Sequence, residues 1–159
     1  MAQHNPWDLE TARRLIAERR SLPGALLPML HALQGHFGYV DPAAIPALAE
    51  ALNLSRAEVH GVVTFYHDFR RTPPGRHVVR LCRAEACQSV GGDALALHVK
   101  QRFGIDFHET TQDGQVSLEA VYCLGLCACS PALVVDGKVH GRVDADRFDR
   151  LLAATTTVR

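Results

Sequence analysis

Two pairs of cysteines in the second half of the chain constrain its fold more than any other feature. Cys82 and Cys87 are separated by four residues, and Cys123 and Cys127 by three. Each pair follows a β-rich run, so each is expected on a loop at the end of a strand. Because the thiolate is the metal-binding form of cysteine and thiolates repel one another, two such loops can converge only around a cation. The pairs therefore predict a metal site at one end of a sheet.

The residues alone leave the identity of the metal open. Pair spacings of this size suit tetrahedral zinc, and sets of four cysteines also hold two-iron and four-iron clusters. Loops of this breadth can wrap a binuclear core, with one pair for each iron. Glycines beside the pairs, such as Gly91 and Gly125, let backbone N–H groups approach sulfur, which favours a redox cluster.

Charged residues and a fifth cysteine lie near the first four. Arg80 and Arg83 flank Cys82 and would favour the reduced form of a cluster, which Glu85 would oppose, although solvated surface arginines explain the pattern equally well. Cys129 leaves a thioredoxin-like reductase using Cys127 and Cys129 as one alternative, but the chain has no Cys-x-x-Cys motif. A zinc-stabilised scaffold that only holds other subunits together is another alternative.

Composition and charge narrow the class of protein. The chain has 159 residues, of which 47% are hydrophobic, so we expect it to fold as a globular protein. Seventeen basic and seventeen acidic residues give a net charge of zero, which argues against nucleic-acid partners. No apolar run is long enough for membrane insertion, and residues 1–8 do not resemble a signal peptide. We therefore expect a cytoplasmic protein, whose thiols are held reduced.

The hydrophobic pattern predicts an α/β protein with two domains. A Pro-Pro-Gly break at residues 73–75 divides an N-terminal four-helix bundle, 1–72, from a second domain, 73–159. Phe65, near the end of the fourth helix, is expected in the core. The helices of the bundle are predicted over 9–20, 23–37, 41–52 and 55–66. Strands are predicted over 77–81, 115–122, 133–135 and 138–140, and further helices over 93–103 and 143–152.

Five stretches together resemble the 24 kDa subunit family of respiratory complex I, and the resemblance extends from about residue 15 to residue 152. They are residues 26–34 (LLPMLHALQ), 37–39 (FGY), 62–66 (VVTFY) and 123–127 (CLGLC), together with the first cysteine pair. The resemblance implies a helical bundle followed by a thioredoxin-like domain that carries one [2Fe-2S] cluster. It also implies that the cluster ligands are Cys82, Cys87, Cys123 and Cys127.

Within that family, residues 80–89 (RLCRAEACQS) are most similar to the gamma subunit of soluble, molybdenum-containing NAD-dependent formate dehydrogenases. The resemblance implies an electron-transfer subunit with no catalytic site of its own. Its partners would be a flavoprotein subunit that binds FMN and NAD and, through it, a molybdenum-containing catalytic subunit. The equivalent subunit of complex I or of a NAD-reducing hydrogenase is the alternative. The chain lacks a Gly-x-Gly-x-x-Gly motif, so FMN and NAD are expected only in the partner.

Overall fold

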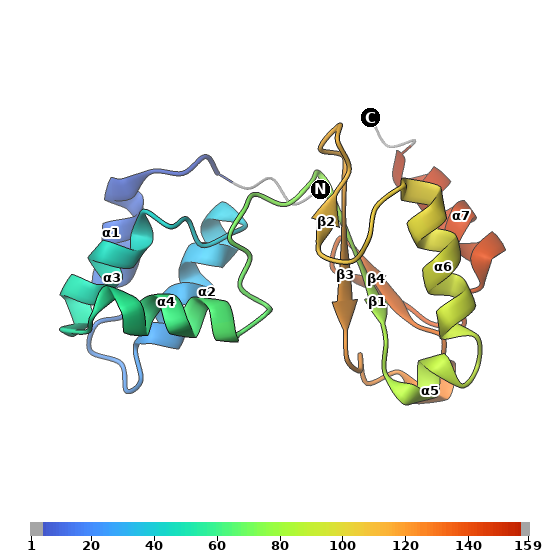
Figure 1. The fold of residues 1–159 in the computed structure, drawn as a ribbon, viewed down its shortest axis with the longest axis horizontal. Coiled ribbons are helices and arrows are strands. Elements are labelled where there is room, and N and C mark those ends of the chain that lie inside the picture. The colour runs from blue at the N-terminus through green and yellow to red at the C-terminus, as the bar shows by residue number, and fades with distance from the viewer. Residues whose placement is uncertain (1–4, 157–159) are drawn as a thin grey trace. The chain divides into compact units, whose positions relative to one another are not determined.

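A computed structural model describes residues 5–156 as two compact units (Figure 1). The described residues up to Pro74 form a helical unit, and those from Gly75 onward form a sheet unit. Residues 1–4, on which the expected absence of a signal peptide partly rests, and residues 157–159 lie outside this description. The division into domains 1–72 and 73–159 stays a prediction.

The helical unit contains the four helices that the hydrophobic pattern predicts. The second and third helices begin three residues later than expected, because the chain first makes a turn. The turn before the second helix covers residues 23–25, and in the turn before the third helix Asp41 accepts a hydrogen bond from the Ala43 N–H at 2.8 Å. The bounds are α1 (Leu9–Ala17), α2 (Leu26–Phe37), α3 (Ala44–Leu52) and α4 (Arg56–Phe65).

Local capping explains where several of these helices begin and end. Asp8 accepts a hydrogen bond from the Thr11 N–H at 2.7 Å at the start of α1. Ser55 and Glu58 form a reciprocal capping box at the start of α4. Gly38 ends α2 with a φ of 83°, a left-handed conformation that glycine adopts without steric cost.

The core of the helical unit consists of the apolar stripes of the four helices, with Met29, Leu30, Leu33 and Leu48 fully buried. The prediction that Phe65 belongs to this core is wrong, because 73% of the residue is exposed. Val59 and Val63 bury one side of α4. Phe65 lies two residues beyond Val63, about 200° around the helix, and therefore faces away from the core.

The sheet unit contains a mixed five-stranded sheet in the order β2-β3-β1-β4-β5. Strands β1 and β3 are parallel, and the other neighbouring pairs are antiparallel. The bounds are β1 (His77–Cys82), β2 (Glu109–Thr110), β3 (Val116–Val121), β4 (Leu133–Val135) and β5 (Lys138–His140).

Two long helices, α6 (Gly92–Phe103) and α7 (Ala145–Thr156), cover one face of this sheet (Figure 1). Their apolar residues, including Val99 and Phe148, pack with Leu81, Leu118 and Leu133 of the sheet. Besides strand β2, the sequence did not predict two short elements, α5 (Glu85–Gln88) and the 3-10 helix η1 (Cys127–Cys129).

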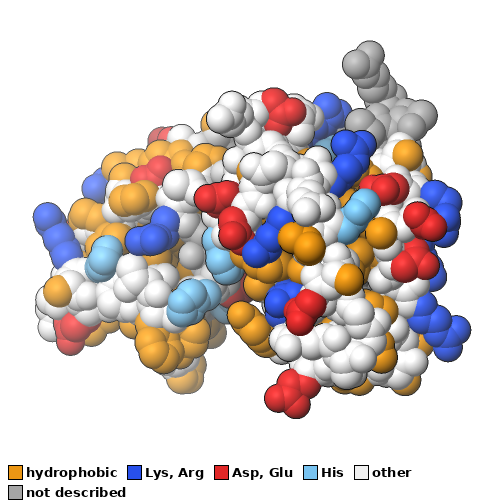
Figure 2. Space-filling view, turned by 45° about the vertical axis from the view of Figure 1, so that its right-hand side comes forward, with side chains coloured by type: hydrophobic (Ala, Val, Ile, Leu, Met, Phe, Trp, Pro, Cys, Tyr) orange, Lys and Arg blue, Asp and Glu red, His pale blue; other side chains and the backbone are white. Residues whose placement is uncertain are grey.

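Side chains of both charges lie on the visible face of the sheet unit (Figure 2). On the face seen in Figure 2, basic and acidic side chains are interspersed over the sheet unit. No helix within residues 5–156 is long and apolar enough to cross a bilayer. The cytoplasmic location stays a prediction.

Candidate metal centre

The two cysteine loops leave the same end of the sheet. Cys82 is the last residue of β1, and Cys123 lies two residues after β3. These strands are parallel, with Cys82 opposite Val121, so their carboxyl ends lie side by side. In Figure 1 both lead to the lower end of the sheet unit, where α5 and the loop after β3 lie.

The second cysteine of each pair lies in a short helical turn. Cys87 belongs to α5 and is 2% exposed, whereas Cys127 begins η1 and is exposed. Cys82 and Cys87 form a small buried cluster with Ala132. Each pair is therefore anchored by one strand end and one helical turn.

The sulfur atoms of the second pair are spaced as two ligands of one metal ion would be. Sγ of Cys123 lies 3.7 Å from Sγ of Cys127, and all five cysteines are free. That distance is far too long for a disulfide, whose sulfur atoms are about 2.05 Å apart. Metal–sulfur bonds of about 2.3 Å in a tetrahedron place two sulfur atoms about 3.8 Å apart. The donor pair therefore fits tetrahedral ligation.

Hydrogen bonds favour the ionised form of the Cys82 thiol. Burial alone would raise the pKa of the Cys82 thiol, yet its hydrogen bonds outweigh burial and lower that pKa. The partners are the backbone N–H of Ala84, the thiol of Cys87, and the backbone N–H groups of Leu124 and Cys123. The same N–H groups would stabilise a metal-bound thiolate.

The four thiols interact electrostatically as a set. The pKa of the Cys127 thiol is raised by its hydrogen bond to Cys123 and by the charge of that residue. Burial and the charges of Cys87 and Cys82 raise it further. All four thiols can ionise together only if a cation neutralises them, so the donor set fits a metal cluster.

The described residues contain no group of three or more His, Cys, Asp or Glu side chains gathered around a single-ion site. The cysteines are arranged as two pairs. Cys123 and Cys127 form one pair after β3, and Cys82 and Cys87 form the other after β1.

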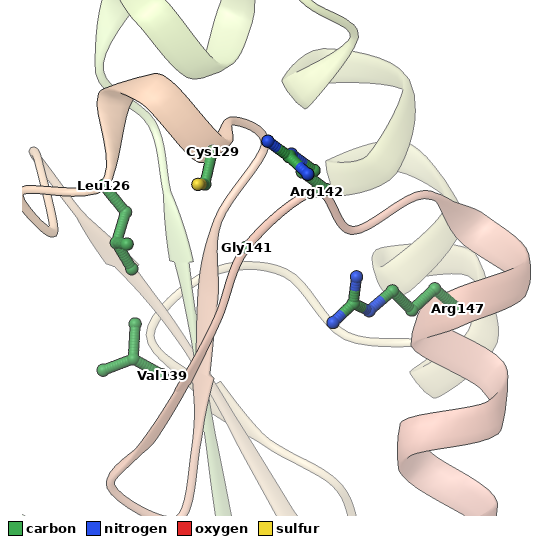
Figure 3. A pocket seen from close by; sticks show the side chains of 6 residues that line it. All are labelled: Leu126, Cys129, Val139, Gly141, Arg142 and Arg147. Carbon is green, nitrogen blue, oxygen red and sulfur yellow. The ribbon is translucent and has the colours of Figure 1, made fainter.

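Cys129 belongs to a separate feature, a surface pocket of about 380 Å³. Figure 3 shows its side chain at the pocket, with Leu126 and Val139 on one side and Arg142 and Arg147 on the other. The charges that raise the pKa of the Cys127 thiol come from Cys123, Cys87 and Cys82, which are the other three predicted ligands.

The arginines beside Cys82 are paired with carboxylates. Nε of Arg80 lies 2.8 Å from Oε2 of Glu119, and Nη1 of Arg83 lies 2.8 Å from Oδ1 of Asp93. The second contact is an ion pair without hydrogen-bond alignment. Each guanidinium charge is therefore largely balanced, which weakens the prediction that these residues favour a reduced cluster.

Of two groups near the sulfur atoms, the sequence indicated one and missed the other. The Gly125 N–H donates to Sγ of Cys123 at 3.4 Å, as the glycine between the second pair of cysteines had indicated. Ser130 lies 3.4 Å from Sγ of Cys87, a contact between residues 43 positions apart that no local pattern indicates.

Two known proteins have sequences similar to that of this chain. One subunit of the NADH-quinone oxidoreductase of Pseudomonas aeruginosa is 38% identical over 130 residues, which cover 82% of this chain and 78% of that protein. The NADP-reducing hydrogenase subunit HndA of Solidesulfovibrio fructosivorans is 33% identical over 144 residues, which cover 89% of this chain and 84% of that subunit.

A solved structure has the same fold. The crystal structure of an air-oxidized NAD+-reducing [NiFe]-hydrogenase matches 89% of this chain with a TM-score of 0.71 and 29% identity, although the match covers only 24% of the hydrogenase chain. Residues 12–156 match the family described as thioredoxin-like [2Fe-2S] ferredoxin, whose cofactor is the [2Fe-2S] cluster. This match confirms the predicted thioredoxin-like fold and favours iron and sulfide over zinc. The chain belongs to the thioredoxin-like [2Fe-2S] ferredoxin family.

Proposed function

We propose that the chain is an electron-transfer subunit that holds one [2Fe-2S] cluster with Cys82, Cys87, Cys123 and Cys127. The placement of both cysteine pairs at one end of a sheet, in a chain of this family, carries the proposal. The 3.7 Å spacing of the Cys123 and Cys127 sulfur atoms supports it.

The residues of the chain have three tasks in this function. The four cysteines give up their protons on binding and become thiolates. Backbone N–H groups, such as that of Gly125, stabilise charge on the sulfur atoms. Cys82 and Cys87 are kept from water by the packing around Ala132. When bound, the cluster supplies a site that gains or loses one electron.

The exposed side of the centre suits exchange with a partner protein. Cys123 and Cys127 are exposed, and Tyr122, directly before them, is 79% exposed. Aromatic residues of this kind are common at protein interfaces. We infer that a flavoprotein subunit with FMN and NAD docks at this end of the sheet, because the named relatives are subunits of NADH- or NADP-linked enzymes.

The finer proposal is that the parent complex is a NAD-dependent formate dehydrogenase with a molybdenum-containing catalytic subunit. Its support is the resemblance of residues 80–89. The equivalent subunit of complex I or of a NAD-reducing hydrogenase is supported at least as directly by the named relatives. The substrate that reduces the complex separates these alternatives.

Replacing single cysteines tests the ligand set. In the anaerobically purified full chain, we expect a serine at position 82, 87, 123 or 127 to remove iron and sulfide or to shift the visible spectrum. Cys129→Ser is the matched control and should keep both. Loss of the cluster in Cys129→Ser, with full retention in one of the other four variants, would overturn the assignment.

Reduction of the purified complex tests the parent enzyme. The chain is isolated with its native partner subunits, and formate, NADH and hydrogen are supplied separately while the visible absorbance is followed. Reduction by formate supports the finer proposal. A complex that NADH or hydrogen reduces but formate does not contradicts it and leaves the electron-transfer role standing.

A further inference from the structure

Ser130 joins the two segments that carry the cysteines. Its Oγ lies 3.4 Å from Sγ of Cys87, which donates to it, and it donates to the backbone carbonyl of Cys127 at 2.9 Å. One serine hydroxyl therefore contacts α5 and η1 together. The proposed function gives it no role.

Metal ligation changes which atom can donate in the contact with Cys87. A metal-bound thiolate carries no hydrogen, so Cys87 can only accept. The serine hydroxyl has one hydrogen and rotates freely about its Cβ–Oγ bond. It can therefore turn from the Cys127 carbonyl toward the Cys87 sulfur. If it did not turn, an oxygen lone pair would face a thiolate, which is unfavourable.

We propose that Ser130 is a positioning residue that donates a hydrogen bond to the Cys87 thiolate and thereby raises the reduction potential of the bound cluster. This inference rests on the proposed function, specifically on Cys87 as a ligand. Reduction adds one electron and hence one negative charge, which a hydrogen-bond donor stabilises. The serine keeps its proton, and no covalent bond forms or breaks.

The surroundings of this contact strengthen its effect. Cys87 is 2% exposed and packs among Ala132, Ala84 and Leu124, so water does not compete for its sulfur. A hydrogen bond at a site of low dielectric is electrostatically stronger than the same bond in water. Backbone N–H groups serve two other sulfur atoms. Those of Ala84, Leu124 and Cys123 bond Cys82, and that of Gly125 donates to the exposed Cys123, where it is screened more.

A redox titration of Ser130→Ala tests the proposal. The full-length chain is purified anaerobically with its cluster, and the reduced fraction is followed by visible absorbance and EPR against a chemical reductant. We expect the equilibrium constant for reduction to fall by about threefold to tenfold. A tenfold fall corresponds to about 59 mV for a one-electron couple.

Two matched variants isolate the hydroxyl group. Ser130→Thr keeps a hydroxyl at this position and should titrate close to the wild type. Ser89→Ala removes a hydroxyl that lies in the same region but bonds the Ala86 carbonyl at 3.1 Å, and it should leave the potential unchanged.

The proposal is wrong if Ser130→Ala binds the full amount of iron and sulfide and its reduction constant stays within twofold of the wild type, or rises. Should Ser130→Ala not hold iron, pulsed EPR of the reduced wild type after brief transfer to D2O decides instead. No fast-exchanging deuterium near the cluster would then contradict a hydroxyl donor. A wild-type chain without a cluster, or Cys87→Ser with an intact one, would instead overturn the proposed function.

Discussion

Single residues determine how closely chain segments approach the cysteines. A Cβ atom placed on Gly92 would lie 2.5 Å from the backbone oxygen of Cys87 and 2.8 Å from its carbonyl carbon. These are backbone atoms, which cannot turn aside as a flexible side chain can. Glycine at this position therefore lets α6 begin directly against α5 and holds Cys87 in place.

We expect Gly92→Ala to destabilise the folded chain by about 1–3 kcal/mol, the usual cost of overpacking, and to lower the iron content of purified protein. Chemical denaturation and iron analysis measure the two effects. Gly61→Ala is the control, because a Cβ there meets no atom within 4 Å and alanine favours a helix. Equal stability and iron content in both variants would contradict this account of Gly92.

At this scale the sequence predicted part of the site. Cys82 and Cys123 could each be placed on a loop at the end of a strand, whereas the parallel pairing of β1 and β3, which brings the two loops side by side, came from the structure. The partner of Cys87 could not be predicted, because Ser130 lies in another segment and meets it only after the fold forms.

Elements with strong local signals were predicted most reliably. Helix α4 began where the capping box of Ser55 and Glu58 indicated. The two-residue strand β2 and the short turns α5 and η1 were missed, because elements of two to four residues are too short to show a hydrophobic period. The position of Phe65 was mispredicted because its aromatic character was given more weight than its place on the helix.

The capping box of α4 makes stability depend on pH. The Ser55 backbone N–H, followed by the Ser55 hydroxyl, lowers the pKa of the Glu58 carboxyl. Because this pKa is lower in the folded chain than in the unfolded chain, the Glu58 carboxylate stabilises the fold at pH values above the pKa that Glu58 has in the unfolded chain. That stabilisation is lost as the pH falls through the folded pKa. We expect Glu58→Gln to melt at a lower temperature than the wild type at neutral pH, and the difference to vanish below the usual glutamate range.

Thermal unfolding followed by circular dichroism from pH 3 to pH 7 measures this difference. Glu50→Gln is the control, because Glu50 is an exposed residue of α3 outside the capping box. A melting difference for Glu58→Gln that stays constant over the whole pH range would contradict the capping role of the charge.

The whole molecule consists of two units joined by a short segment. Arg70 is tied to the helical unit, since its carbonyl accepts from the Val40 N–H at 2.8 Å and its N–H donates to Gln34 at 2.7 Å. Gly75 is tied to the sheet unit, since its N–H donates to Ser117 at 2.7 Å. The joining segment is therefore residues 71–74, within which the sequence had placed the boundary from its two prolines.

Brief trypsin digestion of the native chain tests this boundary. We expect the first cut after Arg71, because the backbone on either side is held by hydrogen bonds to its own unit. The fragment that begins at residue 72 should keep its visible absorbance, since all four proposed ligands lie within it. Mass spectrometry identifies the cut, and a first cut inside α1–α4 or the sheet would contradict the division into two domains.

The whole account depends on the claim that this chain carries a two-iron cluster that accepts one electron. The most direct measurement combines iron and sulfide analysis with EPR of the anaerobically purified wild-type chain during reductive titration. The account predicts about two irons and two sulfides per chain and a paramagnetic signal that grows with one electron taken up. A colourless chain with one zinc, or an iron-free chain even when purified with its native partner subunits, would contradict it.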